Sequence, residues 1–330
     1  MPKSAVVALG GNAFTREGET GSTEEQSRNA ISMARTVATI RRAGWNVVLV
    51  HGNGPQIGNL AIQQEEGAIL VPPQPLFVLG AMTQGEMGSL ISLALREVAP
   101  DLRVAALITH VVVSAEDPAF ASPTKPIGPF FTHAQAGVLA TERGWTVIED
   151  SGRGFRRVVP SPRPLEVVET TAIRALIAAN TIVVAGGGGG VPVVADGAAL
   201  RGAEAVIDKD YVASQLATAL DAEALVLVTG VAQVLLDFGR PTQRPLAEID
   251  VGEAEWHQRD GHFAAGSMGP KVQAATEFVR SGGEVAVITT PELALATLGS
   301  PEARHDKRRP PTTQLGTRIV AMPAQTREKT

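Results

Sequence analysis

Residues 5–9, AVVAL, form a short apolar run that leads directly into Gly10, Gly11 and Asn12. The pattern returns where residues 47–50, VVLV, lead into residues 51–54, HGNG, and where residues 181–185, TIVVA, lead into the glycine run 186–190. Short apolar runs that end at glycines are typical of buried parallel strands followed by tight turns. We therefore predict an α/β protein whose strands end in glycine-bearing turns.

The segments between these strands have the pattern of helices. Ser22 with Glu25 three residues later predicts a capping box, and the helix that follows covers residues 31–40 and ends at Gly44. Pro55 suits the first turn of the next helix. Strands that alternate with helices in this way predict a parallel sheet with helices on its faces.

The rest of the chain continues the alternation. We predict a connection over residues 71–77, a hairpin that begins at residues 234–238, helices over residues 82–98, 166–179, 210–220 and 270–281, and strands over residues 104–113, 224–229, 284–289 and 316–322.

Residues 114–165 differ from this pattern, because prolines punctuate them and Arg153, Arg156 and Arg157 cluster within them. We interpret this segment as an inserted subdomain that protrudes over the site, within a single domain that covers residues 1–330. The alternative is an ordinary long surface connection. Residues 303–314 are rich in arginine and lysine and have the composition of a solvated loop.

The composition narrows the function. The net charge of −5 argues against a general nucleic-acid or membrane surface, and the aromatic content of 4% argues against base-stacking platforms. There is no cysteine, which excludes thiolate metal sites and cysteine nucleophiles and fits a reducing cytosol. The first apolar run is too short for a signal-peptide core or a membrane span, so we expect a cytoplasmic protein.

The glycine turns predict anion binding. Glycine allows backbone N–H groups to approach an anion closely, and helix N-termini add positive potential. A fourth turn, residues 266–271 (GSMGPK), places Lys271 at a helix start, and residues 207–210 (IDKD) place Lys209 between Asp208 and Asp210. Together these features indicate a site that surrounds several phosphate groups. No P-loop motif and no convincing dinucleotide fingerprint is present.

Each of these residues also has a simpler interpretation. Asp208 can be a plain N-cap, and Lys209 and Lys271 can be solvated surface lysines. Lys125 lies on the proline-stiffened loop of residues 123–126 and suits a surface loop equally. His51 lies beside the second turn, where a histidine is more often a structural hydrogen-bonding group than a catalytic base. The histidines show no metal-ligand spacing, so no protein metal site is assigned.

Seven blocks in order along the chain resemble the carbamate kinases, which belong to the amino acid kinase superfamily. The blocks are residues 6–12 (VVALGGN), 51–60 (HGNGPQIGNL), 82–85 (MTQG), 123–130 (PTKPIGPF), 158–162 (VVPSP), 205–210 (AVIDKD) and 266–271 (GSMGPK). The chain departs from the usual family pattern at Ser89, Ala232, Asp237 and Arg240.

The resemblance implies a three-layer αβα sandwich with a mainly parallel central sheet, a protruding subdomain at residues 114–165 and a homodimer. It also implies reversible phosphoryl transfer between carbamoyl phosphate and ADP, which gives carbamate and ATP with Mg²⁺, in arginine or purine breakdown. The alternatives are a related kinase for another small carboxylate or carbamoyl acceptor, and a nucleotide-binding homologue that lacks turnover.

The resemblance also implies a role for each site residue. Lys209 and Lys271 neutralise the moving charge, Asp210 orients them, and Lys125 reaches in from the subdomain. The remaining implied roles are the transferred phosphoryl group for Gly10, Gly11 and Asn12, carbamate for Gly52 and Asn53, and the nucleotide for Asp208, Gly230, Val231, Met268, Gly269 and Pro270. Carbamate already carries a nucleophilic oxygen anion, so no general base is required. The glycine run 186–190 receives no ligand and is interpreted as allowing close backbone packing beside the site.

Overall fold

The structure is a computed structural model that describes residues 3–10, 14–16, 18–150, 152–264, 266–299 and 315–322. Gly11, Asn12 and the basic segment 303–314 lie outside the described residues. Within the described ranges, the central sheet has eight strands in the order β15-β17-β16-β12-β1-β2-β9-β3. Every neighbouring pair in it is parallel except β16 with β17. The α/β class with a mainly parallel sheet is therefore confirmed.

The strands of the central sheet are short and mostly buried on both faces. Their bounds are β1 Ser4–Leu9, β2 Asn46–Val50, β3 Arg103–Ala106, β9 Thr181–Val184, β12 Ala224–Val228, β15 Glu248–Asp250, β16 Val285–Thr289 and β17 Thr317–Val320.

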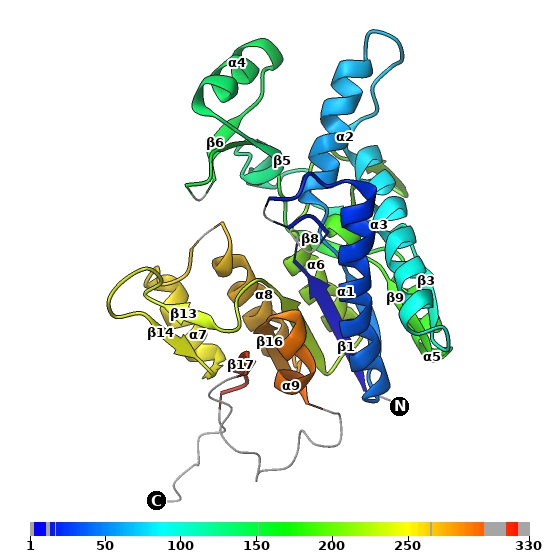
Figure 1. The fold of residues 1–330 in the computed structure, drawn as a ribbon, viewed down its shortest axis with the longest axis vertical. Helices are drawn as coiled ribbons and strands as arrows, with labels where there is room; N and C mark the ends of the chain where they lie inside the picture. Colours follow the sequence, from blue (N-terminus) through cyan, green and yellow to red (C-terminus); the bar gives the residue numbers. More distant parts are fainter. Residues whose placement is uncertain are drawn as a thin grey trace, which may run out of the picture.

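Helices cover both faces of this sheet (Figure 1). The helices are α1 Thr23–Arg42, α2 Gly54–Gly67, α3 Leu76–Val98, α4 His133–Arg143, α5 Thr170–Ala178, α6 Lys209–Ala219, α7 Val251–Arg259, α8 Met268–Arg280 and α9 Ala294–Leu298.

The alternation of side chains along β1 divides the core into two layers. Val6 and Ala8 pack in the cluster that contains residues of α5, α6, α7 and α8, whereas Val7 and Leu9 pack in the cluster that contains residues of α1, α3 and α9. Successive side chains of a strand point to opposite faces, so each strand contributes to both layers. This is the predicted αβα sandwich.

Three smaller sheets complete the described fold. β4 His110–Val113, β8 Pro164–Val167, β10 Val191–Asp196 and β11 Ala199–Gly202 form one of them. β13 Val234–Leu236 and β14 Arg244–Leu246 form the predicted hairpin, and β5 Lys125–Phe131, β6 Val147–Glu149 and β7 Phe155–Val159 form the third. Figure 1 shows β5, β6 and α4 at one end of the molecule, away from α8 and the central sheet.

Several local predictions are confirmed and others need correction. The capping box of Ser22 and Glu25 opens α1, and Pro55 lies in the first turn of α2. The single strand predicted over residues 104–113 is wrong: it divides into β3 and β4, which belong to different sheets. At the division, the Gln84 side chain of α3 bonds the backbone N–H and carbonyl of Thr109.

Two predicted helix starts are also wrong. α5 begins at Thr170 rather than at residue 166, because residues 164–167 pair with β4 as strand β8. α3 begins at Leu76, inside the predicted connection, and the Glu204 carboxylate accepts a hydrogen bond from the Leu76 N–H at 3.1 Å. Within the described residues, α3 is the single helix long and apolar enough to cross a membrane by length and composition. Here it contributes to the core layer that it shares with α1.

Candidate active site

A cleft of about 610 Å³ lies at the carboxyl ends of the central strands. Gly10 follows β1, Gly52 follows β2, Gly230 follows β12 and Thr290 follows β16, and all four line it. β1 lies between β2 and β12, so the earlier strands β2, β3 and β9 extend the sheet on one side of β1 and the later strands from β12 onward extend it on the other. Ligands of open α/β sheets bind outside the carboxyl ends of the strands at such a reversal.

Helix N-termini give this cleft a positive potential. α2 begins at Gly54, α6 at Lys209 and α8 at Met268, and residues at or next to each start line the cleft. Asn53 and Ser267, the residues before α2 and α8, make no side-chain capping bond to their helices. Their first-turn N–H groups are therefore not capped by these side chains, which suits an anion.

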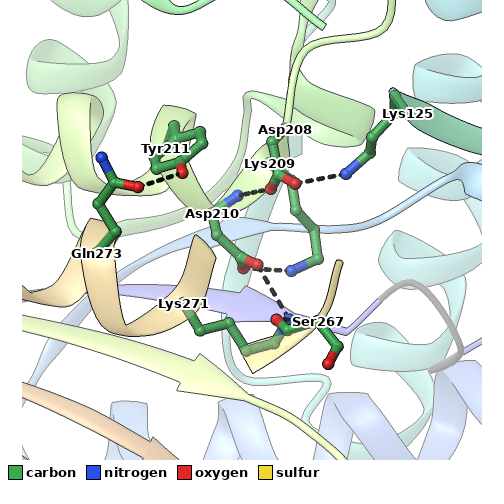
Figure 2. Close-up of polar contacts among 8 residues, drawn as sticks. All are labelled: Lys125, Asp208, Lys209, Asp210, Tyr211, Ser267, Lys271 and Gln273. Carbon is green, nitrogen blue, oxygen red and sulfur yellow. Dashed lines mark hydrogen bonds and ion pairs between the residues drawn. The ribbon is translucent and has the colours of Figure 1, made fainter. Parts of the chain in front are cut away.

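Two lysines meet one buried carboxylate in the cleft (Figure 2). Lys209 Nζ lies 2.5 Å from Asp210 Oδ1, and Lys271 Nζ lies 3.1 Å from Asp210 Oδ2. Asp210 is 3% exposed. Burial alone would raise the pKa of Asp210, but the two ammonium groups outweigh burial and hold it well below its usual range. Asp210 is therefore ionised and holds the two cations close together.

The two lysines differ in protonation energetics. Burial lowers the pKa of Lys209, and Asp210 only partly opposes that effect. Burial acts on Lys271 in the same direction, but Asp210 and Asp208 outweigh it and raise the pKa of Lys271. Both lysines face the cleft as donors that a phosphate group can share with Asp210.

A third lysine enters from another part of the chain. Lys125 Nζ, at the start of β5, lies 2.5 Å from Asp208 Oδ2 (Figure 2). Asp208 is the N-cap of α6, because its Oδ1 accepts the Asp210 N–H at 2.9 Å. Burial would raise the pKa of Asp208, and Lys125 instead helps to hold it below its usual value. The structure thus gives Asp208 the capping position that the sequence suggested and pairs it with Lys125 as well.

The other expected site residues divide into two groups. Gly10, Gly52, Asn53, Asp208, Gly230 and Pro270 line the cleft with the three lysines and Asp210. Val231, Met268 and Gly269 are not among the lining residues: Met268 packs against the core, and Gly269 N–H bonds Ala264 O at 2.9 Å. Gly11 and Asn12 lie outside the described residues.

The glycine run 186–190 supports the turn at residues 51–54 by close packing. A Cβ atom at Gly187 would lie 2.1 Å from His51 Nε2, and one at Gly188 would lie 2.1 Å from Asn53 Nδ2. Gly188 N–H also bonds His51 O at 2.7 Å. Only glycine allows both residues to lie so close, which fits the packing interpretation of this run.

His51 is not a plausible acid or base in this setting. It is 1% exposed, and burial lowers its pKa to about 4. Its Nδ1 lies 3.1 Å from the Gly52 carbonyl oxygen. A neutral, enclosed imidazole of this kind positions the turn, as the sequence suggested.

The structure adds cleft residues to which the sequence reasoning assigned no ligand role. They are Arg16, Asn29, Ser32, Met33, Pro55, Pro126, Asp150, Arg153, Arg156, Gly188, Ile207, Val228, Thr229, Thr290, Pro291 and Glu292. The arginine cluster near residue 156 was visible in the sequence, but its direction depends on which face of β7 each side chain occupies.

No cluster of three or more His, Asp or Glu side chains that could hold a metal ion occurs among the described residues. Asp208 and Asp210 are already paired with lysines. The protein side chains that line the cleft therefore suit phosphate groups better than a free cation.

Comparison with known proteins gives a consistent result. The model of the amino acid kinase family matches residues 3–290. The chain is 44% identical over 307 residues to a carbamate kinase of Pyrococcus horikoshii, which covers 90% of this chain and 97% of the relative. A carbamate kinase of Lentilactobacillus hilgardii is 43% identical and covers 88% of this chain and 92% of the relative.

Solved structures agree with the sequence relatives. A carbamate kinase from Giardia lamblia bound to citric acid matches with a TM-score of 0.89 and 39% identity, over 97% of this chain and 99% of that chain. The same enzyme bound to AMP-PNP, over the same shares of the two chains, matches with a TM-score of 0.84 and 39% identity.

Proposed function

The chain belongs to the amino acid kinase family, and on that premise we propose that it is a carbamate kinase, which transfers a phosphoryl group reversibly between carbamoyl phosphate and ADP. The observation that carries the proposal is the pair of lysines held on Asp210, with Lys125 on Asp208, in a cleft lined by helix N-termini. Phosphoryl transfer needs positioning and neutralisation of charge rather than covalent chemistry by the protein.

The proposed step needs no proton transfer. A β-phosphate oxygen of ADP attacks the phosphorus of carbamoyl phosphate, and the bond from phosphorus to the carbamoyl oxygen breaks. The electron pair of that bond remains on the oxygen, which becomes part of the carbamate carboxylate. Total charge is unchanged, so the reaction needs no general base, and the enclosed, neutral His51 is consistent with it.

Each group of cleft residues has a part in this proposal. Lys209 and Lys271 neutralise the phosphoryl oxygens in flight, and Asp210 orients them. Gly10, Gly11 and Asn12 hold the phosphoryl group, and Gly52 and Asn53 hold carbamate. The nucleotide occupies the half of the cleft near Gly230 and Pro270. Mg²⁺ enters with the nucleotide phosphates, since Asp208 and Asp210 are engaged by lysines.

We also propose a cellular setting and an assembly state. The cysteine-free composition supports a cytoplasmic enzyme, and a role in arginine or purine breakdown follows from the reaction. A homodimer is supported by exposed apolar side chains on α3, where Leu93 is 64% and Met82 43% exposed. Sedimentation of the purified protein tests the dimer.

The reaction is tested by measuring ATP formation from carbamoyl phosphate and ADP in a coupled assay. We expect magnesium-dependent turnover, and in the reverse direction ADP formation from ATP with ammonia and bicarbonate but not with acetate. Turnover only with another carboxylate would favour the related-kinase alternative. Tight ADP binding with no turnover for any acceptor would favour the non-catalytic homologue.

A further inference from the structure

Arg156 lines the cleft, but none of the roles proposed above involves it. It lies on β7 Phe155–Val159, and its side chain is 13% exposed. Its Nε donates a hydrogen bond to Gly128 O at 3.1 Å, and its Nη1 donates one to Asp150 Oδ2 at 3.1 Å. The Phe130 ring lies beneath the guanidinium, 5.1 Å away. These contacts fix the plane of the guanidinium without using every N–H group.

The unused nitrogen faces the turn at residues 52–54, which contains the proposed carbamate-binding residues. Arg156 Nη2 donates no hydrogen bond within the described part of the chain. It lies 3.8 Å from the position that a Cβ at Gly54 would take, the same distance as Pro126 O. Gly54 is the first residue of α2 and directly follows Gly52 and Asn53. The free guanidinium edge therefore lies beside the acceptor half of the cleft and a helix N-terminus.

The charged side chains around Arg156 carry a net positive charge. Arg153 also lines the cleft, and it shares the Asp150 carboxylate with Arg156 at 3.7 and 3.1 Å respectively. Two guanidinium groups against one carboxylate leave one positive charge at this wall. Burial lowers the pKa of Arg156 and Asp150 opposes that effect, but an arginine remains charged at neutral pH. An anionic ligand would complete the arrangement.

We propose that Arg156 binds the carboxyl end of the acceptor, donating from Nη2 to the carbamate carboxylate or to the carbonyl oxygen of carbamoyl phosphate. This inference rests on the proposed function. As the bond from phosphorus to the carbamoyl oxygen breaks, charge moves onto the two carbamate oxygens that Arg156 faces. A fixed guanidinium favours a planar, two-oxygen acceptor, because its N–H groups lie in one plane. Arg156 is then a determinant of acceptor specificity, separate from the lysines that neutralise the phosphoryl group.

The neighbouring arginine provides a matched control. Arg157 lies next to Arg156 on β7, pairs with Glu65 at 2.9 Å and packs over the Trp145 ring at 4.8 Å. It has the same side chain in a similar environment of one carboxylate and one aromatic ring. It does not line the cleft. A general effect of losing a lobe arginine would appear in both variants, whereas acceptor binding would be lost only at residue 156.

The test is steady-state ATP formation by the full-length enzyme with carbamoyl phosphate varied at saturating ADP, and then with ADP varied. Arg156→Ala should raise the KM for carbamoyl phosphate about 10- to 100-fold, as expected for the loss of a charge-assisted hydrogen bond, while the KM for ADP changes less than about twofold. Arg156→Lys should also raise the KM for carbamoyl phosphate, because an ammonium group cannot keep the bonds to Gly128 O and Asp150 that fix the donor in place. Millimolar guanidinium ion should partly restore Arg156→Ala. Arg157→Ala should leave both KM values near wild type.

The inference is overturned if the KM for carbamoyl phosphate is unchanged in both Arg156 variants, or if the KM values for carbamoyl phosphate and ADP rise equally. In either case, turnover by the wild-type enzyme preserves the proposed function. Absence of wild-type turnover would instead remove the function on which the inference rests. If Arg156→Ala unfolds at a lower temperature than Arg157→Ala, Arg156→Lys alone decides the outcome.

Discussion

At the scale of single residues, Asp210 determines the character of the cleft. Two ammonium groups next to each other repel, and a buried carboxylate between them is what allows both to remain charged. Asp210 is held by Lys209 and Lys271 and lies in the first turn of α6, whose N-cap is Asp208.

Lys125 is 26% exposed along its side chain, against 9% for Lys209. We therefore expect truncation of Lys125 to reduce activity less than truncation of Lys209.

The buried His51 should make stability depend on pH. Its folded-state pKa of about 4 lies below the ordinary value of 6.5. Between these values the unfolded chain binds a proton that the folded chain does not, so stability is full above pH 6.5 and falls as the pH approaches 4. The loss amounts to roughly 3 kcal/mol over this window.

Urea unfolding at several pH values checks this prediction. His51→Gln should flatten the decline between pH 6.5 and 4, whereas substitution of the exposed His133 should leave it unchanged. An identical decline in wild type and His51→Gln would show that other groups cause the pH dependence.

At the scale of elements, the turn at residues 51–54, which contains the proposed carbamate-binding residues, depends on the glycine run 186–190 that packs against it. Gly187 to Gly190 pack against His51, Asn53, Ile207 and Val111, which come from three parts of the chain. Gly188 combines a positive φ of 64° with contact to the Asn53 side chain. The run therefore positions the residues expected to bind carbamate without touching it through side chains.

Gly188→Ala and Gly197→Ala separate these two effects. Both residues have positive φ, 64° and 60°, but a Cβ at Gly197 meets no atom within 4 Å. Gly197→Ala should cost about 1–2 kcal/mol of unfolding free energy from backbone strain alone. Gly188→Ala should cost at least about 1–3 kcal/mol more because of the clash with Asn53, and should raise the KM for carbamoyl phosphate. Equal losses in the two variants, measured by urea unfolding, would show that Asn53 moves aside freely.

The sequence predicted those features that depend on neighbouring residues. The Ser22 and Glu25 capping box, the strand of residues 46–50 and the Lys209 helix start are local patterns, and each was found. The division of residues 104–113 was missed because it depends on contacts with other elements, such as the bond from Thr109 to Gln84 of α3 and the pairing of β3 and β4 in different sheets. Arg156 was seen as one of a cluster, but the face of β7 that it occupies depends on how β7 pairs with β5 and β6.

At the scale of the whole molecule, two parts of the chain complete one site. The sandwich supplies Lys209, Asp210 and Lys271, and the segment that contains β5 and β7 supplies Lys125 and Arg156. This segment contacts the sandwich through α2, where Gly58 lies against Gly128 of β5. A Cβ at Gly58 would lie 2.0 Å from the Gly128 Cα atom. The contact therefore admits no side chain at residue 58.

Gly58→Ala should loosen this contact. Alanine favours a helix over glycine by about 1 kcal/mol, so Gly67→Ala, at the open end of α2, should be neutral or slightly stabilising. Gly58→Ala should instead lower the melting temperature, speed proteolysis within residues 114–165 and raise the KM for carbamoyl phosphate. Wild-type proteolysis and KM in this variant would show that the segment does not need the contact.

The central claim is that Lys209 and Lys271, held by Asp210, neutralise the phosphoryl group during its transfer. The rate of ATP formation from carbamoyl phosphate and ADP tests this claim most directly. Wild type and Lys3→Ala, whose lysine pairs with Glu284 on the surface, should turn over alike. Lys209→Ala and Lys271→Ala should each lose on the order of 2–4 kcal/mol of transition-state stabilisation, about 30- to 1,000-fold in kcat/KM. Near-normal rates in either variant, or no turnover in a wild-type protein that binds ADP, would contradict the claim.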